Sequence, residues 1–468
     1  MRVAFCSSEI APFAKTGGLG DVCGTLPLAL EKLKIEPVLV LPRYQMIDPQ
    51  KYQLKKISPE AWIGTAGQNI PVYFIEQEGY FGRKEIYGED GGEYSDNLER
   101  FHCFCLKALE LFKTQKKTMD IIHVHDWQAA LIPVLLKSIF RSDLFYKKTK
   151  SILSIHNMAF QGIFPKDQFP KLGFDRRLFS MNGLEFYNQI NLLKGGLIFS
   201  DRVATVSPHY AREIRTPEFG CGLEGVLANR REGVVGILNG LDYETWNPEA
   251  DVHIKHRYSK DNWKSKFENK SYLQKLVGLP VKRNVPILAF VGRLTYQKGI
   301  ELLMKAMDKV LALDLQLVFL GVGEPKYEQP LRRLAKKNPA KIAVSLKFSE
   351  ELAHQIYAGS DLFLMPSVFE PCGLSQMISF RYGTIPLVYR TGGLADTVFP
   401  FDPATGEGTG FIFDQYKEDA FLKSLQEALL AYQDRPSFER LMTKVMNSDF
   451  SWERSAKEYQ KLYLSLLN

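Results

Sequence analysis

The chain has few of the features that mark a secreted, membrane-spanning or zinc-binding protein. Its six cysteines are scattered over 468 residues and form no C-x-x-C pair. Because a disulfide framework or a zinc cage needs several closely spaced cysteines, we predict reduced thiols. No segment contains the roughly 18 consecutive apolar residues that a membrane helix requires. The first residues enter a buried-strand pattern directly, without a basic and apolar leader, so we expect a cytoplasmic protein.

The sequence also lacks the motifs of several nucleotide-binding and metal-dependent enzymes. It contains no G-x-x-x-x-G-K-[ST] loop, and Gly18-x-Gly20 is not completed to G-x-G-x-x-G. A P-loop phosphotransferase is therefore not expected. There is no D-x-D sequence, with which one class of sugar transferases holds a divalent ion. His123, His125 and Asp126 are close enough on a strand to share a site, yet no other cluster supplies a further ligand, so we predict no metal and no cofactor.

Basic side chains only slightly outnumber acidic ones. The formal charge of +7 arises from 60 basic and 53 acidic residues, most of them interleaved. The longest basic clusters, at residues 147–148, 332–333 and 336–337, are interpreted as solvated faces. We expect neither nucleic-acid nor membrane binding, whereas a phosphate-bearing substrate suits the mild positive balance.

Short β-branched runs alternate with helical patterns along almost the whole chain. They occupy residues 2–6, 37–41, 121–125, 151–156 and 202–206, and then residues 287–291, 316–320, 341–346, 362–365 and 385–388. This alternation predicts parallel sheets covered by helices, and 468 residues are too many for one core. We predict two doubly wound α/β domains with a cleft between them and a hinge within residues 239–282. Ligands of such sheets bind beyond the carboxyl ends of strands, so the loops that follow strands should carry the function.

One such loop, PSVFEPCGLS at residues 366–375, contains Glu370. A helix is expected to begin near residues 373–375, where free N–H groups can hold a phosphate while Glu370 accepts hydrogen bonds from sugar hydroxyls. The ordinary alternative is that Glu370 caps the helix, but Pro371 and Gly373 favour a shaped loop. Ile378 stands where a partner carboxylate would be sought, so a two-carboxylate glycosidase mechanism is not indicated.

Two cations follow another predicted strand. In FVGRLTYQKG at residues 290–299, Arg293 and Lys298 precede a helix expected at residues 300–310. Arginine offers a fixed fork and lysine a mobile point charge, and together they can neutralise a diphosphate leaving group. Two ordinary surface cations are the alternative, but their position after a strand favours phosphate.

A short recurrence links the two halves. KTGGLGD at residues 15–21 resembles RTGGLAD at residues 390–396, with a basic residue, a glycine pair and an acid in each. Paired glycines let backbone N–H groups approach a ligand, and a helix N-terminus attracts anions. Two ordinary tight turns are the alternative, but the number of matching positions favours a function.

Seven motifs, in the same order, resemble those of the bacterial glycogen synthase and plant starch synthase family. They are KTGGLGD (15–21), HDW (125–127), HN (156–157), NGLD (239–242), GRLTYQKG (292–299), EPCGL (370–374) and RTGGLAD (390–396). The resemblance implies the GT-B fold, with two Rossmann-like domains at residues 1–240 and 241–450 facing each other across a deep cleft, and a last helix within 451–468 that crosses back to the first. It also implies retaining transfer of glucose from ADP-glucose to the non-reducing 4-OH end of an α-1,4-glucan, without a metal.

The resemblance further implies roles for residues in these motifs. The implied catalytic residues are Glu370, Arg293, Lys298 and His156. The implied substrate-binding residues are Lys15, Gly17, Gly18, Asp21, Asp126, Asn157, Asn239, Phe348, Cys372, Gly373, Leu374 and Ser375. Relatives often carry Gly-Tyr-His-Glu where this chain has KFSE at residues 347–350. Phe348 can therefore stack on a base but lacks a hydroxyl, and Ser349 has no assigned role.

Several alternatives remain open at this stage. The same chemistry can use UDP-glucose or a small sugar acceptor. The chain can also be an inactive glucan-binding protein, although intact Lys15, Arg293, Lys298 and Glu370 argue against this. A dehydrogenase is disfavoured by the incomplete glycine motif. The sequence does not indicate the oligomeric state.

Overall fold

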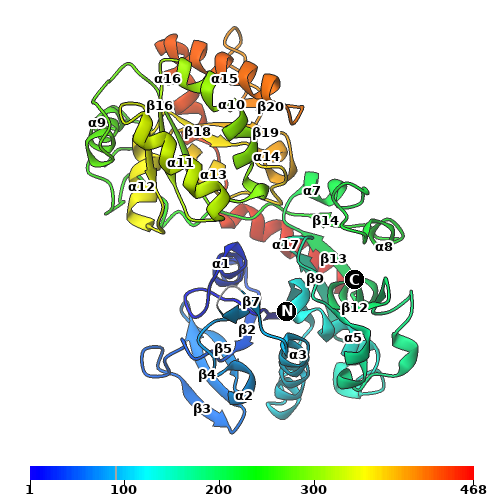
Figure 1. The fold of residues 1–468 in the computed structure, drawn as a ribbon. Helices are drawn as coiled ribbons and strands as arrows, with labels where there is room; N and C mark the ends of the chain where they lie inside the picture. The colour runs from blue at the N-terminus through cyan, green and yellow to red at the C-terminus, as the bar shows by residue number, and fades with distance from the viewer. Residues whose placement is uncertain (90–91, 468) are drawn as a thin grey trace. The chain divides into compact units, whose positions relative to one another are not determined.

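The computed structural model describes residues 1–89 and 92–467 and divides into two compact units. Unit 1 comprises residues 1–240 and the C-terminal segment from Trp452, and unit 2 comprises residues 241–451 (Figure 1). Within the described ranges, no helix is both long enough and apolar enough to cross a bilayer.

Unit 1 is built on a nine-stranded sheet. Its strands are β1 (Arg2–Cys6), β2 (Glu36–Pro42), β3 (Lys55–Ser58), β4 (Ala61–Ala66), β5 (Ile70–Ile75), β8 (Ile121–His125), β9 (Lys150–Ile155), β13 (Arg202–Thr205) and β14 (Val235–Gly236). Their order is β14-β13-β9-β8-β1-β2-β5-β4-β3. All neighbours from β14 to β5 pair in parallel, whereas β4 and β3 are added antiparallel. The five strands predicted in this half are present at nearly the predicted residues.

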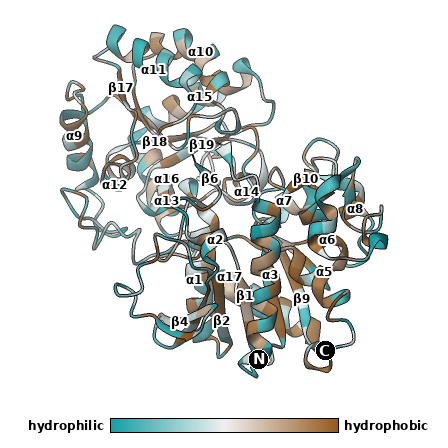
Figure 2. Cartoon of the chain, turned by 60° about the horizontal axis from the view of Figure 1, so that its bottom comes forward, coloured by the Kyte–Doolittle hydropathy of each residue, from teal (hydrophilic) through white to brown (hydrophobic). Residues whose placement is uncertain are grey.

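Helices and two small sheets complete unit 1. The helices are α1 (Gly18–Lys32), α2 (Glu78–Phe81), α3 (Asn97–Thr114), α4 (Asp126–Ala129), α5 (Leu131–Lys137), α6 (Leu192–Phe199), α7 (Pro208–Glu213), α8 (Glu224–Ala228) and α17 (Trp452–Leu467), with 3-10 turns η1 (Leu144–Tyr146), η2 (Lys166–Leu172) and η3 (Arg176–Leu178). The small sheets consist of β10 (Ile163–Pro165), β11 (Glu185–Phe186) and β12 (Gln189–Asn191), and of β6 (Gly88–Glu89) and β7 (Gly92–Glu93). In Figure 2 the strands β1 and β2 carry the brown of hydrophobic residues, whereas α3 is banded with hydrophilic teal. This banding is typical of a helix that covers a sheet with one face.

The last helix, α17, packs within unit 1 against α1. Glu453 forms an ion pair with Lys32 at 3.0 Å, and Gln460 Nε2 donates to the Leu33 carbonyl at 3.1 Å. Tyr463 is fully buried, and its hydroxyl lies 2.9 Å from Nδ1 of His123 in β8. The chain thus returns to unit 1 after completing unit 2.

Unit 2 contains a six-stranded parallel sheet in the order β17-β16-β15-β18-β19-β20. Its strands are β15 (Ile287–Val291), β16 (Gln316–Leu320), β17 (Ile342–Ser345), β18 (Leu362–Met365), β19 (Ile385–Tyr389) and β20 (Phe411–Phe413). Its helices are α9 (Lys266–Leu276), α10 (Ile300–Ala312), α11 (Pro325–Lys337), α12 (Glu350–Gly359), α13 (Ser375–Arg381), α14 (Gly392–Thr397), α15 (Glu418–Gln433) and α16 (Arg435–Met446), with the 3-10 turn η4 (Tyr296–Lys298). The five strands predicted in this half are all present.

Most of the predicted hinge is a packed part of unit 2. The units divide between Gly240 and Leu241, and α9 packs on α12. Part of the charge that suggested a hinge is buried and paired within this unit, since Lys270 lies 2.7 Å from Asp361.

Candidate active site

The strand order of unit 2 brings two loops together. Strands β15, β16 and β17 extend to one side and β18, β19 and β20 to the other, so the order reverses between β15 and β18. Open sheets of this type bind ligands outside the carboxyl ends of the two strands at the reversal. The loops that follow these strands are residues 292–299, with Arg293 and Lys298, and residues 366–374, with Glu370.

An ion pair joins the two loops. Nζ of Lys298 lies 2.6 Å from Oε2 of Glu370, and Ser367 Oγ donates to the same oxygen at 3.0 Å. The Glu370 side chain is 8% exposed and the Lys298 side chain is 22% exposed, so water screens this pair only partly. Glu370 therefore pairs with Lys298 and does not cap α13, whose N-cap residue is Leu374.

Backbone contacts hold the same loops against each other. The N–H of Val368 donates to the Gln297 carbonyl at 2.9 Å. Gly299, directly after Lys298, has φ +76°, and a Cβ at this position would lie 1.8 Å from the Pro366 carbonyl oxygen. Only glycine fits such a turn, so this residue fixes the approach of Lys298 to Glu370.

The glycine pair of RTGGLAD supports the Glu370 loop from a third side. The Gly393 N–H donates to the carbonyls of Glu370 and Pro371 at 3.0 and 3.1 Å. A Cβ on Gly392 would lie 1.9 Å from the Glu370 carbonyl oxygen, and a Cβ on Gly393 would lie 2.0 Å from that of Cys372. The Gly393 amide is thus bonded within the protein and not directed to a ligand as the motif suggested. In unit 2 the glycine motif at residues 390–396 therefore acts on the site by supporting the loop that carries Glu370.

The residues after Glu370 form a turn into α13. Gly373 has φ +72°, and Gln376 Nε2 donates to the carbonyls of Cys372 and Gly373 at 3.1 and 2.9 Å. The N-cap residue Leu374 makes no side-chain cap hydrogen bond. Since the first amides of a helix carry partial positive charge, this start at Ser375 suits the phosphate predicted there.

Two further predicted residues of unit 2 are exposed. Arg293 follows the end of β15, and no carboxylate of the described residues forms an ion pair with it. Phe348 is 88% exposed in the loop after β17, so both faces of its ring are accessible. Ser349 has a structural role, because its Oγ caps α12 by accepting from the Leu352 N–H at 3.2 Å.

In unit 1 the strand order reverses between β1 and β8, and the loop after β1 contains Lys15, Gly17 and Gly18. Lys15 forms a half-exposed ion pair with Asp21 at 2.6 Å. A Cβ on Gly17 or Gly18 would meet nothing within 4 Å, so space is open around both glycines. The loop therefore combines a cation with an accessible backbone at the start of α1.

A buried carboxylate that the sequence analysis missed holds this loop. Glu9 is 3% exposed and accepts hydrogen bonds from the Thr16 N–H at 2.6 Å, the Thr16 hydroxyl at 2.7 Å and the Gly17 N–H at 3.2 Å. The Tyr87 hydroxyl donates to it at 2.6 Å. The only sequence signal for Glu9 is its position just after β1, as an acid in an otherwise apolar and small-residue stretch.

Replacing Glu9 with glutamine should weaken both the fold and the binding of the nucleotide sugar that the family resemblance implies. The amide nitrogen cannot accept the two hydroxyl hydrogen bonds that one oxygen of Glu9 now receives, and the bonds from the Thr16 and Gly17 N–H groups lose their charge assistance, which costs about 1 kcal/mol for each bond. Urea unfolding would measure the lost stability, and the KM for the sugar nucleotide should rise as the Lys15 loop loosens. Tyr87→Phe, which removes one donor only, should have a smaller effect. If the Glu9→Gln protein is less stable but its KM is unchanged, Glu9 contributes to the fold and not to substrate binding.

The structure brings Asp126, His156 and Asn157 together after β8 and β9. Asp126 Oδ1 accepts the His156 N–H at 2.7 Å, and the Asn157 backbone also donates to this carboxyl group. Burial raises the pKa of Asp126 to about 7 despite these bonds. Burial lowers the pKa of His156 to about 4, so its imidazole, 3.0 Å from Nδ1 of His125, is neutral at pH 7.

Asn239 is also buried, and its Oδ1 accepts no hydrogen bond from the described residues. No direct contact joins it to Asp126 or His156 among the hydrogen bonds of that part of the chain. Both nitrogens of His123 are bonded within the protein, to Tyr463 at 2.9 Å and to Ser154 at 2.7 Å. His123 is thus a structural histidine.

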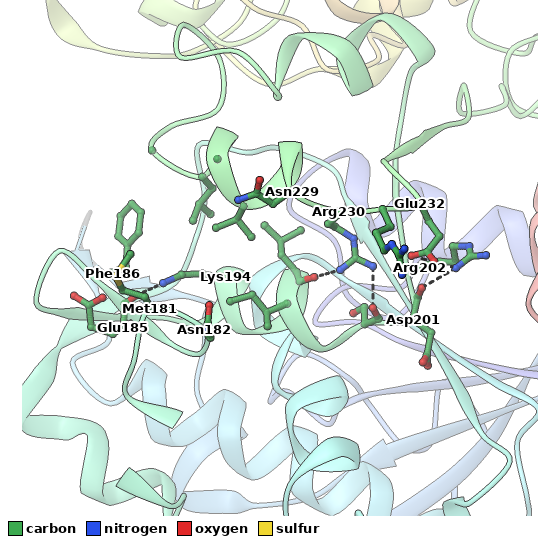
Figure 3. A pocket seen from close by; sticks show the side chains of 18 of the residues that line it. Met181, Asn182, Glu185, Phe186, Lys194, Asp201, Arg202, Asn229, Arg230 and Glu232 are labelled. Carbon is green, nitrogen blue, oxygen red and sulfur yellow. Dashed lines mark hydrogen bonds and ion pairs between the residues drawn. The ribbon is translucent and has the colours of Figure 1, made fainter. Parts of the chain in front are cut away.

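A cavity of about 1110 Å³ in unit 1 contains none of the predicted site residues (Figure 3). Several of its cations are bonded to the protein itself. Arg230 donates to the carbonyls of Leu197 and Ser200, at the end of α6, and Lys194 donates to the Glu185 carbonyl. A large volume alone therefore does not identify the active site.

The comparisons with known proteins agree over the whole chain. The starch synthase catalytic domain model matches residues 2–229, and the glycosyl transferases group 1 model matches residues 277–441. Relatives named glycogen synthase, from Thermotoga petrophila and Geotalea daltonii, are each 43% identical, and each comparison covers 100% of this chain and 99% of the relative.

Solved structures give the same result. The catalytic domain of starch synthase IV from Arabidopsis thaliana, bound to ADP and acarbose, is 35% identical, with a TM-score of 0.89 and 99% of both chains covered. Sucrose-phosphate synthase from Thermosynechococcus elongatus, 17% identical with a TM-score of 0.61 and 99% and 98% coverage, shares the fold alone. The predicted GT-B fold and family resemblance are confirmed. The chain belongs to the glycogen and starch synthase family of hexosyltransferases.

Proposed function

We propose that this chain transfers glucose from ADP-glucose, with retention of configuration, to the 4-OH at the non-reducing end of an α-1,4-glucan. The observation that carries the proposal is the Lys298–Glu370 ion pair at the reversal of strand order in unit 2. The related starch synthase IV was solved with ADP, which supports a nucleoside diphosphate sugar as donor.

In the proposed reaction the loop cations act on the leaving group. Lys298 and Arg293 stabilise the negative charge that develops on the diphosphate as the bond from C1 of glucose to its oxygen breaks. Glu370 accepts hydrogen bonds from sugar hydroxyls and, through its 2.6 Å contact, keeps Lys298 in place. The amides at residues 372–375 bind phosphate oxygens. The acceptor 4-OH attacks C1 from the face that the diphosphate leaves, and its proton passes to the departing oxygen.

Residues of unit 1 also have proposed substrate contacts. Asp126, His156, Asn157 and Asn239 bind glucose hydroxyls, and a neutral His156 can donate to a sugar oxygen without adding charge. Lys15, held by Asp21 and by the loop that Glu9 orders, binds the diphosphate together with the Gly17-Gly18 backbone. Each of these side chains lies at or after the carboxyl end of a strand.

The exposed Phe348 ring should favour ADP-glucose over UDP-glucose. Adenine offers a larger stacking face than uracil, and stacking on an aromatic side chain contributes about 1–3 kcal/mol per base. Phe348→Ala should therefore lower kcat/KM with ADP-glucose by about 5- to 100-fold, and less with UDP-glucose. Glucose incorporation into glycogen from each nucleotide sugar would measure this.

Matched controls make the donor experiment specific. Phe399, another aromatic side chain of unit 2, is 51% exposed, and Phe399→Ala should leave both donors unaffected. Free glucose and fructose as acceptors would test the small-acceptor alternative. A higher kcat/KM for UDP-glucose, or transfer to a monosaccharide in preference to glycogen, would contradict the proposed function.

A further inference from the structure

Strand β17 forms one edge of the unit 2 sheet, and its outer side is paired with no strand of residues 1–89 and 92–467. The Leu317 N–H donates to the Lys341 carbonyl, and the Gly321 N–H donates to the Ser345 carbonyl. In a parallel ladder the backbone groups of alternate residues face the same neighbour. The N–H and C=O of Val344 therefore face away from β16 and are presented to the outside.

Two hollows adjoin this edge, with volumes of about 320 and 550 Å³. Both are lined by Ala343, Val344 and Ser345 of β17, and both also contact Val277 and Lys347. The strand thus lies at both hollows and packs against α11 (Figure 2).

The hollows lie on opposite faces of the sheet. From β16 the chain forms α11 and enters β17, one strand nearer the edge of the sheet. It then forms α12 and returns across the sheet to β18. The two connections therefore run in opposite directions across the sheet. Because such crossovers are right-handed, α11 and α12 cover opposite faces. The larger hollow is lined by α11, and the smaller one by α9 and α12.

The two hollows differ in chemistry. The larger one is lined by the cations Arg332, Lys336 and Lys347 and by no carboxylate. All three cations are exposed, and none forms an ion pair within the described part of the chain. The smaller hollow has Leu276 and Leu352 in its wall, together with polar side chains that include Lys347, Gln355 and a single acid, Glu351.

We propose that β17 is a docking edge for an extended segment of a partner protein in which acidic and apolar residues alternate. Such a segment would pair with the outward backbone groups of Val344. Since successive side chains of a strand point to opposite faces, its acids would meet Arg332 and Lys336 while its apolar residues enter the hollow at Leu276 and Leu352. Backbone pairing supplies affinity, and the two hollows supply the sequence preference.

The charges disfavour a second copy of this chain as the occupant. Two β17 strands joined antiparallel about a two-fold axis would place the same sheet face of both copies on the same side. Arg332 and Lys336 of one copy would then approach those of the other, and like charges opposed across a strand pair are destabilising. An acidic partner segment has the opposite charge and meets no such cost.

Fluorescence anisotropy with the full chain tests the proposal. The probe is a fluorescein-labelled peptide of four Glu-Val repeats with blocked ends, compared with a peptide of the same composition in blocks, Glu₄Val₄. We expect saturable binding of the alternating peptide, at least tenfold weaker binding of the block peptide, and weaker binding at higher salt. The variant Arg332→Glu/Lys336→Glu should bind the alternating Glu-Val peptide at least tenfold more weakly. It should instead bind a peptide of Lys-Val repeats.

Two further variants keep the test specific. Lys417→Glu/Lys423→Glu makes the same charge change on and beside α15, which packs on β20 at the other edge of the sheet, and should bind the peptide normally. Val344→Pro removes one outward donor and should abolish binding. Transfer of glucose to glycogen should be unchanged in both charge-reversal variants, which shows that they fold. Absent binding, equal affinities for the two peptides, or a dimer in sedimentation that Val344→Pro dissociates would overturn the proposal.

Discussion

Lys298→Ala should lower kcat with saturating ADP-glucose and glycogen by about 10²- to 10³-fold. Removing one preorganised group that stabilises transition-state charge typically costs about 2.7–4 kcal/mol. Lys298 is placed for this role by the Gly299 turn and by its 2.6 Å contact with Glu370. KM for the donor should change less than kcat, because the charge on the diphosphate increases as the bond to glucose breaks. Steady-state rates of glucose incorporation into glycogen provide the measurement.

The same substitution leaves the shielded Glu370 carboxylate without its partner, which is itself destabilising. A double variant separates the two effects. In Lys298→Ala/Glu370→Gln no unpaired charge remains, so its stability should return toward that of the original protein while kcat stays low. Recovery of kcat together with stability would mean that the pair is structural. Lys305→Ala, which removes an exposed lysine from the same loop-and-helix segment, should change neither quantity.

The central strands of both sheets could be predicted because they are buried on both faces. All five residues of β8 and of β16 are buried, and apolar or β-branched residues make up most of each, interrupted by His123 and His125 in β8 and preceded by Gln316 in β16. Strands β3 and β4 were missed because they are partly exposed, and β5 was missed although most of it is buried, since Pro71 interrupts its pattern. Half-exposed strands near a sheet edge lack the signal that identifies buried ones.

The candidate site divides in the same way. The positions of residues that closely follow a strand, such as Arg293 and Asp126, could be predicted because parallel strands place their carboxyl ends at one edge. Glu9 and Tyr87 could not, because their contact joins segments 78 positions apart and depends on how the connecting chain folds. The second glycine motif shows the reverse error, since Gly393 donates to the loop of Glu370 and not to a ligand.

Asp126→Asn should stabilise the protein at high pH while it removes activity. Burial raises the pKa of Asp126 to about 7, whereas the carboxyl of an unfolded chain titrates near 3.9. Between about pH 4 and pH 7 the unfolded chain has released a proton that the folded protein keeps, so the free energy of unfolding falls as the pH rises through this range. Above pH 7 the buried carboxylate is ionised, and the free energy of unfolding is lower by the full amount that this pKa shift implies, about 4 kcal/mol.

Asparagine avoids this cost because it carries no charge, and it tolerates the φ of +55° found at this position. Its Oδ1 can still accept the His156 N–H, and the loss of charge assistance in this bond and in the one from the Asn157 backbone offsets part of the gain. Urea unfolding should show Asp126→Asn more stable than the original protein at pH 8, with a gap that closes toward pH 4. Asp308→Asn, at an exposed position of α10, should show no pH-dependent gap. A gap that instead widened at low pH would mean that Asp126 is ionised in the fold. If Asp126→Asn is more stable than the original protein but has a lower kcat, the carboxylate is retained for its contact with the sugar. Neutralising a carboxylate that served folding alone would not make the protein more stable.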